Sequence, residues 1–81
     1  MEIAFTPSAW RSWKKLPAKT RVRLQEKLLL YSKDPLQYAI KLKESKIGDF
    51  RFRIGDYRIV FDLQPDRLIV LAVGDRKEIY K

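Results

Sequence analysis

Residues 50–63 read FRFRIGDYRIVFDL, in which apolar and charged residues alternate on both sides of a Gly-Asp pair. Alternation with a period of two is typical of strands that bury one face. Gly55-Asp56 is a two-residue connection, and glycine easily adopts the positive φ angle that tight hairpin turns require. The segment therefore predicts two antiparallel strands joined by a turn, with the phenylalanines on the buried face.

The length of this turn predicts which residues of the two strands face each other. With a two-residue loop, Arg53 lies opposite Arg58, and Arg51 lies on the same face. Like charges directly opposite one another destabilise a strand pair by a few tenths to about 1 kcal/mol. Such a pattern favours anion binding, because a guanidinium group is planar and its N–H donors are arranged to bond two phosphate oxygens at once. The alternative is that these arginines are ordinary solvent-facing residues on the polar side of a sheet.

Two helices are expected upstream of the hairpin. Residues 3–5 predict a short opening strand, and Thr6-Pro7 is typical of a helix start, because proline lacks the N–H that has no partner there. The first helix is predicted to span residues 7–16, and the second to span residues 17–32. The apolar face of the second helix comprises Val22, Leu24, Leu28, Leu29 and Tyr31.

The helical pattern is expected to stop at Asp34-Pro35, because the residue before a proline disfavours helical angles. Residues 68–73 are apolar on both faces and predict a strand with neighbours on either side. Gly74 is expected to interrupt this strand, and residues 75–81 to form a charged tail or a last short strand. The predicted fold class is α+β, with an N-terminal strand, a two-helix hairpin and an antiparallel meander of three to four strands, the helices packing on one sheet face.

The chain has 81 residues and contains neither cysteine nor histidine. This length suits a single domain covering residues 1–81, because a second core could not be buried. The missing residue types exclude disulfides, a thiol nucleophile and the usual zinc sites. The carboxylates are too scattered for a magnesium site, so neither a metal nor a cofactor is expected. No secretory leader or membrane-spanning stretch is recognisable, and a cytoplasmic location is therefore expected.

The formal net charge is +8, from 18 Lys and Arg against 10 Asp and Glu. A domain this basic attracts polyanions, so nucleic acid or an acidic protein segment is the expected partner. Trp10 and Trp13 are candidates for stacking on bases. Aromatic residues on a helix beside Leu16 more often lie in the core, however, and a core position is the expectation here.

Three motifs follow one another along the chain: KLK at residues 41–43, GDFRFRIGDYRIVF at residues 48–61 and VGDRKEIY at residues 73–80. In this order they resemble the toxins of the RelE/ParE superfamily of type II toxin–antitoxin systems, and the similarity extends over essentially the whole chain. The resemblance implies a RelE-like, microbial-ribonuclease-like fold. For RelE-type members it implies an mRNA interferase, a ribosome-dependent endoribonuclease that cuts messenger RNA in the A site by 2′-hydroxyl attack, without a metal.

The resemblance also implies roles for individual residues. Arg51 and Arg53 match two basic strand positions near the scissile phosphate. Arg58 matches a phosphate-binding arginine, Arg76 an arginine that stabilises the transition state, and Tyr80 an aromatic residue that orients a base. The RNA- or ribosome-binding positions that it implies are Lys41, Lys43, Lys46 and Lys77.

Two departures from the family pattern bear on the chemistry. Many relatives have histidine where this chain has Asp75, and others have lysine in place of Arg51 or Arg53. Arginine stays protonated in the working pH range and is a poor general base. The general base is therefore left open between Tyr80 and Asp75, and we expect catalysis to rest on electrostatic stabilisation and in-line positioning of the phosphate.

The resemblance implies a cognate antitoxin protein that wraps the basic surface of the toxin. Messenger RNA and ribosomal RNA are the other expected partners, operator DNA would be contacted only through the antitoxin, and no membrane contact is expected. Two other functions stay open. One is a ParE-like inhibitor of DNA gyrase without nuclease activity, and the other is a catalytically inactive module that binds the antitoxin on operator DNA.

Overall fold

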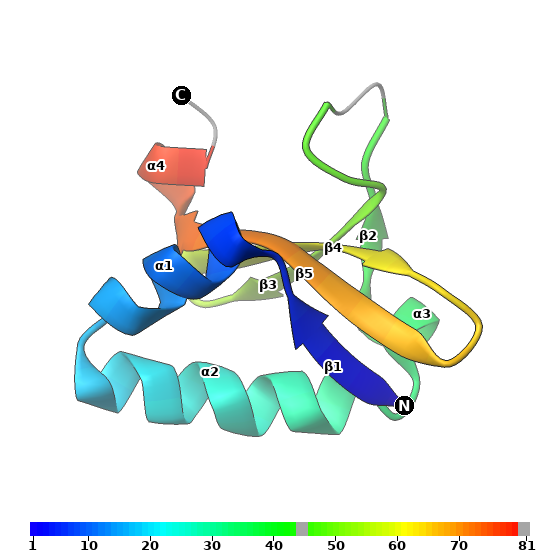
Figure 1. Ribbon diagram of the computed structural model, residues 1–81, viewed down its shortest axis with the longest axis horizontal. Coiled ribbons are helices and arrows are strands. Elements are labelled where there is room, and N and C mark those ends of the chain that lie inside the picture. The colour runs from blue at the N-terminus through cyan, green and yellow to red at the C-terminus, as the bar shows by residue number, and fades with distance from the viewer. Residues whose placement is uncertain (44–45, 80–81) are drawn as a thin grey trace.

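The computed structural model describes residues 1–43 and 46–79 as a sheet with helices packed against it (Figure 1). In chain order the elements are β1 (Glu2–Phe5), α1 (Pro7–Lys15), α2 (Ala18–Tyr31), α3 (Pro35–Tyr38), β2 (Ile40–Lys41), β3 (Phe50–Ile54), β4 (Tyr57–Leu63), β5 (Arg67–Asp75) and α4 (Arg76–Ile79). The five strands lie in the order β1-β5-β4-β3-β2. The predicted α+β class, with its opening strand and helical hairpin, is confirmed.

The start of α1 is fixed by the residues that the sequence indicated. Thr6 caps the helix, since the backbone N–H of Ala9 donates to Thr6 Oγ1 at 3.1 Å, and Pro7 occupies the first turn. Such a cap satisfies a backbone donor that the helix itself leaves without a partner. Leu16 and Pro17 are extended, which separates α1 from α2.

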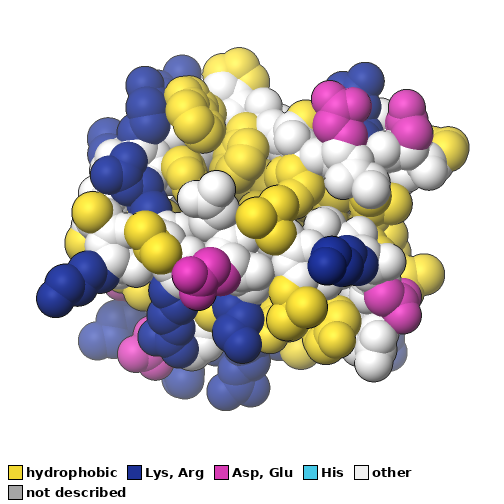
Figure 2. Space-filling model, turned by 90° about the horizontal axis from the view of Figure 1, so that it is seen from below, with side chains coloured by type: hydrophobic (Ala, Val, Ile, Leu, Met, Phe, Trp, Pro, Cys, Tyr) yellow, Lys and Arg dark blue, Asp and Glu magenta, His cyan; other side chains and the backbone are white. Residues whose placement is uncertain are grey.

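The apolar face of α2 is narrower than predicted. Leu24 and Leu28 are buried against the sheet and Tyr31 is half-buried, but Val22 and Leu29 are 56% and 53% exposed. The prediction was wrong for these two residues, because the helix meets the sheet along one stripe only. Figure 2 looks at the molecule from the side of α2 and shows hydrophobic side chains at this surface among Lys and Arg.

The β3–β4 hairpin forms in the predicted register. Arg53 lies opposite Arg58, and Gly55 in the turn has a φ angle of 59°. Phe52 is fully buried on the helical side of this hairpin, with its ring centroid 4.2 Å from that of Phe61 and 5.2 Å from that of Tyr31. The alternation in residues 50–63 thus places aromatic side chains in the core and arginines on the opposite face.

The strand β5 lies between β1 and β4, which confirms the prediction of a strand with two neighbours. The strands β2 to β5 form the predicted antiparallel meander, and the opening strand β1 pairs with β5 in parallel. Gly74 does not interrupt β5, because it pairs with Arg58 and the strand continues to Asp75.

The chain after β5 forms the helical turn α4, where a tail or strand was expected. The N–H of Glu78 donates to Asp75 Oδ1 at 2.9 Å, so the side chain of Asp75 caps this turn. A second unpredicted helix is α3, which begins at Pro35, directly after the point where the sequence indicated only an end to helical structure. Both are single turns, too short to leave a periodic pattern in the sequence.

The sheet face opposite α2 is partly covered. In Figure 1, α4 and the loop between β2 and β3 rise on this side of the sheet, while α2 runs along the other. Gly48 in that loop lies so close to the sheet that a Cβ atom on it would come within 2.6 Å of Leu71 Cδ1 and 3.0 Å of Val60 Cγ1. Val60 is fully buried as a result. The open part of the sheet face that carries the arginines is therefore narrowed from both sides.

In the part of the chain that the structure describes, no helix has the length and apolar character needed to cross a bilayer.

The narrow stripe of α2 can be tested with two neighbouring leucines. Leu28→Ala should lower the free energy of unfolding by about 2 to 5 kcal/mol, because Leu28 is only 3% exposed and its truncation leaves a cavity in the core. Leu29→Ala is the matched control and should change it by less than about 0.5 kcal/mol. Urea denaturation followed by circular dichroism measures both. Equal losses would show that Leu29 is packed in solution.

Candidate phosphate-binding site

The strand β3 carries two arginines on the sheet face opposite the core. Arg53 is exposed and Arg51 is half-buried, and both alternate with core residues of the same strand. Arg53 stands directly opposite Arg58 of β4. The predicted juxtaposition of like charges is therefore present in the backbone register, although the three side chains differ in their access to solvent.

Arg58 is held inside the protein rather than at the surface. Its side chain is 5% exposed, and Nη1 donates to the carbonyl oxygens of Gly55 at 2.8 Å and Tyr57 at 2.9 Å. The guanidinium therefore reaches back to the turn at the end of its own hairpin. The structure does not place it beside Arg53 as a second exposed phosphate donor.

Arg76 reaches the same turn from the other end of the chain. Its backbone N–H donates to the carbonyl oxygen of Asp56 at 2.8 Å, which ties the start of α4 to the hairpin. Beside it lies an open pocket of about 490 Å³, lined by Asp56, Asp75, Arg76 and Lys77. A pocket of this volume is of the size that accepts a small ligand such as one nucleotide unit.

The carboxylates near this pocket are not bonded to the exposed arginines within the part of the chain that the structure describes. Within residues 1–43 and 46–79, no acidic side chain forms an ion pair or hydrogen bond with the guanidinium of Arg53 or of Arg76. Asp75 uses Oδ1 to cap α4. Asp62 lies on the same sheet face but accepts from the N–H of Asp49 at 2.7 Å, so it holds the adjacent loop in place.

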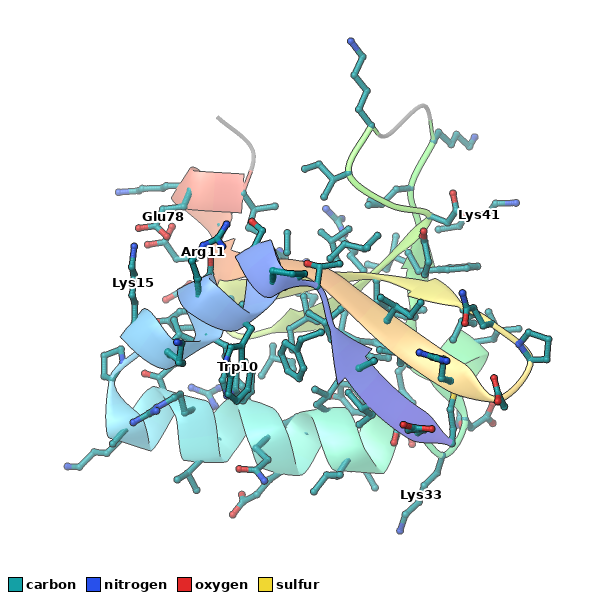
Figure 3. The ribbon with its side chains drawn as sticks, in the orientation of Figure 1. Trp10, Arg11, Lys15, Lys33, Lys41 and Glu78 are labelled. Carbon is teal, nitrogen blue, oxygen red and sulfur yellow. The ribbon has the colours of Figure 1, made fainter. Side chains whose placement is uncertain are left out.

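The predicted RNA-binding lysines divide into two groups. Lys77 lines the pocket beside Arg76. Lys41, Lys43 and Lys46 are exposed and belong to β2 and the loop that follows it. Figure 3 shows Lys41 on that side of the molecule, away from α4 and Glu78. Tyr80 lies outside the described residues, so its predicted role stays a prediction.

Comparison with known proteins decides the family. A family model described as the ParE toxin of the type II toxin–antitoxin system, parDE, matches residues 3–80. The chain belongs to the ParE toxin family. The earlier resemblance to RelE/ParE toxins of type II toxin–antitoxin systems is thereby confirmed. A comparison with curated protein sequences gives no significant match.

Solved structures of related toxins share the fold of this ParE-family toxin. A chain of the RelBE2 toxin–antitoxin complex from Mycobacterium tuberculosis is 27% identical, with a TM-score of 0.82 over 93% of this chain and 96% of that one. The isolated RelE toxin of E. coli is 26% identical, with a TM-score of 0.76 over 98% and 89%. A YoeB/ParE toxin from Agrobacterium tumefaciens is 18% identical, with a TM-score of 0.74 over 94% of this chain and 99% of that one. At this identity the likeness supports a shared fold only.

The toxin has three further basic residues near this end of the sheet that were not among the predicted site residues. A Cβ atom on Gly55 would come within 3.0 Å of Nη2 of Arg23, so this arginine of α2 lies against the turn. Arg11 and Lys15 are one helical turn apart on α1, and Figure 3 shows both on the side of Glu78. The four-residue spacing of Arg11 and Lys15 is visible in the sequence. The approach of Arg23 to the turn depends on how α2 packs and has no sequence signal.

The two tryptophans of α1 lie at a second feature, an apolar groove of about 290 Å³ lined by Ile3, Phe5, Trp10, Trp13, Gln25, Leu28 and Leu29. Trp13 is 8% exposed, which confirms the expected core position, whereas Trp10 is 47% exposed at the edge of the groove. Both rings contact Phe5 edge-on, at centroid distances of 5.2 Å for Trp13 and 5.5 Å for Trp10. This groove lies apart from the arginines and is a candidate protein-docking surface.

The repulsion between Arg53 and Arg58, which lie opposite each other, should lower the stability of the free toxin. We expect Arg53→Thr to raise the free energy of unfolding by a few tenths to about 1 kcal/mol, because it removes a like charge opposite Arg58 and threonine suits a strand. The gain should shrink in high salt, which screens the repulsion. Chemical denaturation at low and high ionic strength measures both effects.

Arg67→Thr is the matched control, because Arg67 is also an exposed strand arginine but lies opposite Glu2. It should leave stability unchanged or lower it slightly. If Arg53→Thr lowers stability as much as the control does, the opposed charges are not in conflict in solution.

Proposed function

We propose that this ParE-family toxin is a ribosome-dependent endoribonuclease that cleaves messenger RNA in the A site by 2′-hydroxyl attack, without a metal. The observation that carries the proposal is the grouping of cations at one end of the sheet. Arg53 is exposed there, and Arg76 borders a pocket at the same hairpin. No described carboxylate pairs with either guanidinium, so both are available to a phosphate.

The proposed reaction is an in-line displacement at phosphorus. The 2′-oxygen forms a bond to the phosphorus and the 5′-oxygen of the next nucleotide leaves, giving a cyclic phosphate and a 5′-hydroxyl end. Arg53, assisted by Arg51, would hold the non-bridging oxygens, and Arg76 would stabilise the extra negative charge of the pentacoordinate state. The chain offers cations for this task, and the ribosome would supply much of the in-line alignment of the RNA.

The proton of the 2′-hydroxyl needs an acceptor, and the leaving 5′-oxygen needs a donor. Asp75 lines the pocket beside Arg76, and capping α4 occupies only one of its two carboxylate oxygens. The other oxygen is therefore a candidate acceptor, with Tyr80 as the second candidate group for the proton transfers. Lys77 in the same pocket would hold the adjacent RNA backbone, as Lys41, Lys43 and Lys46 would hold ribosomal RNA further away.

The proposed protein partner is an antitoxin of the kind seen in the related complexes. The solved relatives include RelBE complexes from Mycobacterium tuberculosis and E. coli. In this chain the apolar groove at Trp10 offers a site for an apolar helix or strand, and the net charge of +8 favours an acidic partner. Operator DNA would be reached through the antitoxin, and the site of action would be the cytoplasm, where ribosomes are.

A second candidate function is inhibition of DNA gyrase by binding, without nuclease activity. It is favoured by the description of the matching family model, which names the ParE toxin. The two functions share one fold, and fold alone does not decide between them. The exposed Arg53 and Arg76, which form no ion pair with a described carboxylate, support the nuclease, because RNA cleavage needs cations near the scissile phosphate and inhibition by binding alone does not.

Cleavage in a translation extract tests the proposal. The wild-type toxin should truncate a reporter message on ribosomes, and Arg76→Ala should slow truncation by about 100-fold or more, the usual loss when one transition-state donor is removed. Arg53→Ala should also slow it. Primer extension on the message measures the rate and the cut positions.

Arg67→Ala is the control for charge, because Arg67 is an exposed arginine of β5 that pairs with β1 and lies outside the pocket. It should cut at nearly the wild-type rate. If messages stay intact while supercoiling by gyrase stops, the gyrase candidate replaces the nuclease.

A further inference from the structure

Arg58 is the only buried charged residue among those that the structure describes. We propose that Arg58 is a positioning residue that binds no substrate phosphate. Its buried guanidinium fixes the β3–β4 turn, and the turn in turn sets the position of Arg76. The coupling itself is independent of the reaction, and only its consequence for RNA cleavage rests on the proposed function.

Three consecutive carbonyl groups of the turn carry this inference. The carbonyl oxygens of Gly55 and Tyr57 accept hydrogen bonds from Arg58 Nη1, at 2.8 and 2.9 Å. The carbonyl oxygen between them, that of Asp56, accepts from the backbone N–H of Arg76 at 2.8 Å. Two arginines far apart in the sequence are thus joined through one tight turn. A shift of the outer carbonyls would move the middle one and the start of α4 with it.

The surroundings of Arg58 explain why a phosphate does not reach it. Arg58 pairs with Gly74 of β5, and a Cβ atom on Gly74 would come within 3.2 Å of Glu78 Oε2 and 3.5 Å of Ile79 Cγ1. Because Gly74 has no side chain, α4 can pack over this row of the sheet. A phosphate could approach Arg58 only if α4 moved away, and α4 begins with Arg76. The same structure therefore cannot offer both arginines to one phosphate.

A charged hydrogen-bond donor suits this task better than a neutral one. Hydrogen bonds from a guanidinium to carbonyl oxygens are stronger than those between neutral groups, and one nitrogen here serves two carbonyls. Support of this kind matters here, since both residues of the turn, Gly55 and Asp56, are exposed to solvent. Arg23 approaches the same glycine from α2. Arg58 therefore holds the turn through hydrogen bonds to its carbonyl groups, and Arg23 of α2 lies against its glycine.

Amide hydrogen exchange tests the coupling without any assumption about function. In Arg58→Met, which keeps the aliphatic stem but removes the donors, the Arg76 amide should exchange at least tenfold faster than in the wild type. Amides of the β1–β5 ladder, such as that of Thr6, which donates to Val70, serve as an internal control and should not change. Arg67→Met is the matched variant for loss of an exposed charge and should leave the Arg76 amide protected.

The salt dependence of RNA binding separates a positioning residue from a phosphate ligand. Each phosphate contact that is lost should lower the slope of log K against log salt by about 0.7 for single-stranded RNA. With a single-stranded RNA oligonucleotide, Arg53→Met and Arg76→Met should each show this decrease. Arg58→Met should keep the wild-type slope, although its cleavage in the translation extract should fall by tenfold or more.

The opposite result overturns the inference. If Arg58→Met lowers the slope as Arg53→Met does and leaves the Arg76 amide protected, Arg58 is a phosphate ligand. Arg58→Lys keeps the charge and serves if the methionine variant does not fold. It should retain the slope and expose the Arg76 amide, and a protected amide in Arg58→Lys also counts against the coupling. A wild-type toxin that cuts no message would refute the proposed nuclease, while the exchange experiment would still decide the role of Arg58.

Discussion

The two-residue turn at Gly55-Asp56 is the constraint on which the site depends. A positive φ angle at Gly55 closes the hairpin without extra residues, and this closure sets the register of β3 against β4. A shift by one residue would move the arginines of β3 into the core and the phenylalanines into solvent. The same turn then holds the backbone of Arg76. Register and site geometry therefore have a common origin.

The two candidate binding surfaces differ in chemistry and lie on different layers of the molecule. The face with α4 and the β2–β3 loop carries the arginines and the mixed-charge pocket, whereas the opposite layer carries the aromatic groove between β1, α1 and α2. A cationic site suits an RNA backbone, and an apolar groove suits a protein segment. Because the apolar groove lies apart from the arginine face, a protein partner bound in the groove need not cover the arginines.

The family and the fold do not decide the activity of this ParE-family toxin. The matching family model names a ParE toxin. Two of the solved structures that share the fold are instead a RelBE complex and a RelE toxin, with TM-scores of 0.82 and 0.76. A fold of this kind supports different chemistries through the side chains on its exposed face. The features that bear on the choice are therefore the exposure of Arg53 and Arg76 to solvent and the fact that no carboxylate of residues 1–43 and 46–79 forms an ion pair with either guanidinium.

The sequence by itself determined the helix cap at Thr6, the hairpin, its register and the face on which the arginines stand, because each follows from contacts between residues close in the chain. Tertiary packing alone decided how deeply each arginine lies. Arg53 and Arg58 are equivalent by alternation, yet one is exposed and the other is 5% exposed, because α4 folds back over Gly74. The parallel pairing of β1 with β5 and the approach of Arg23 to the turn likewise join residues far apart in sequence. Local periodicity carries no information about such contacts, since they form only when the layers pack.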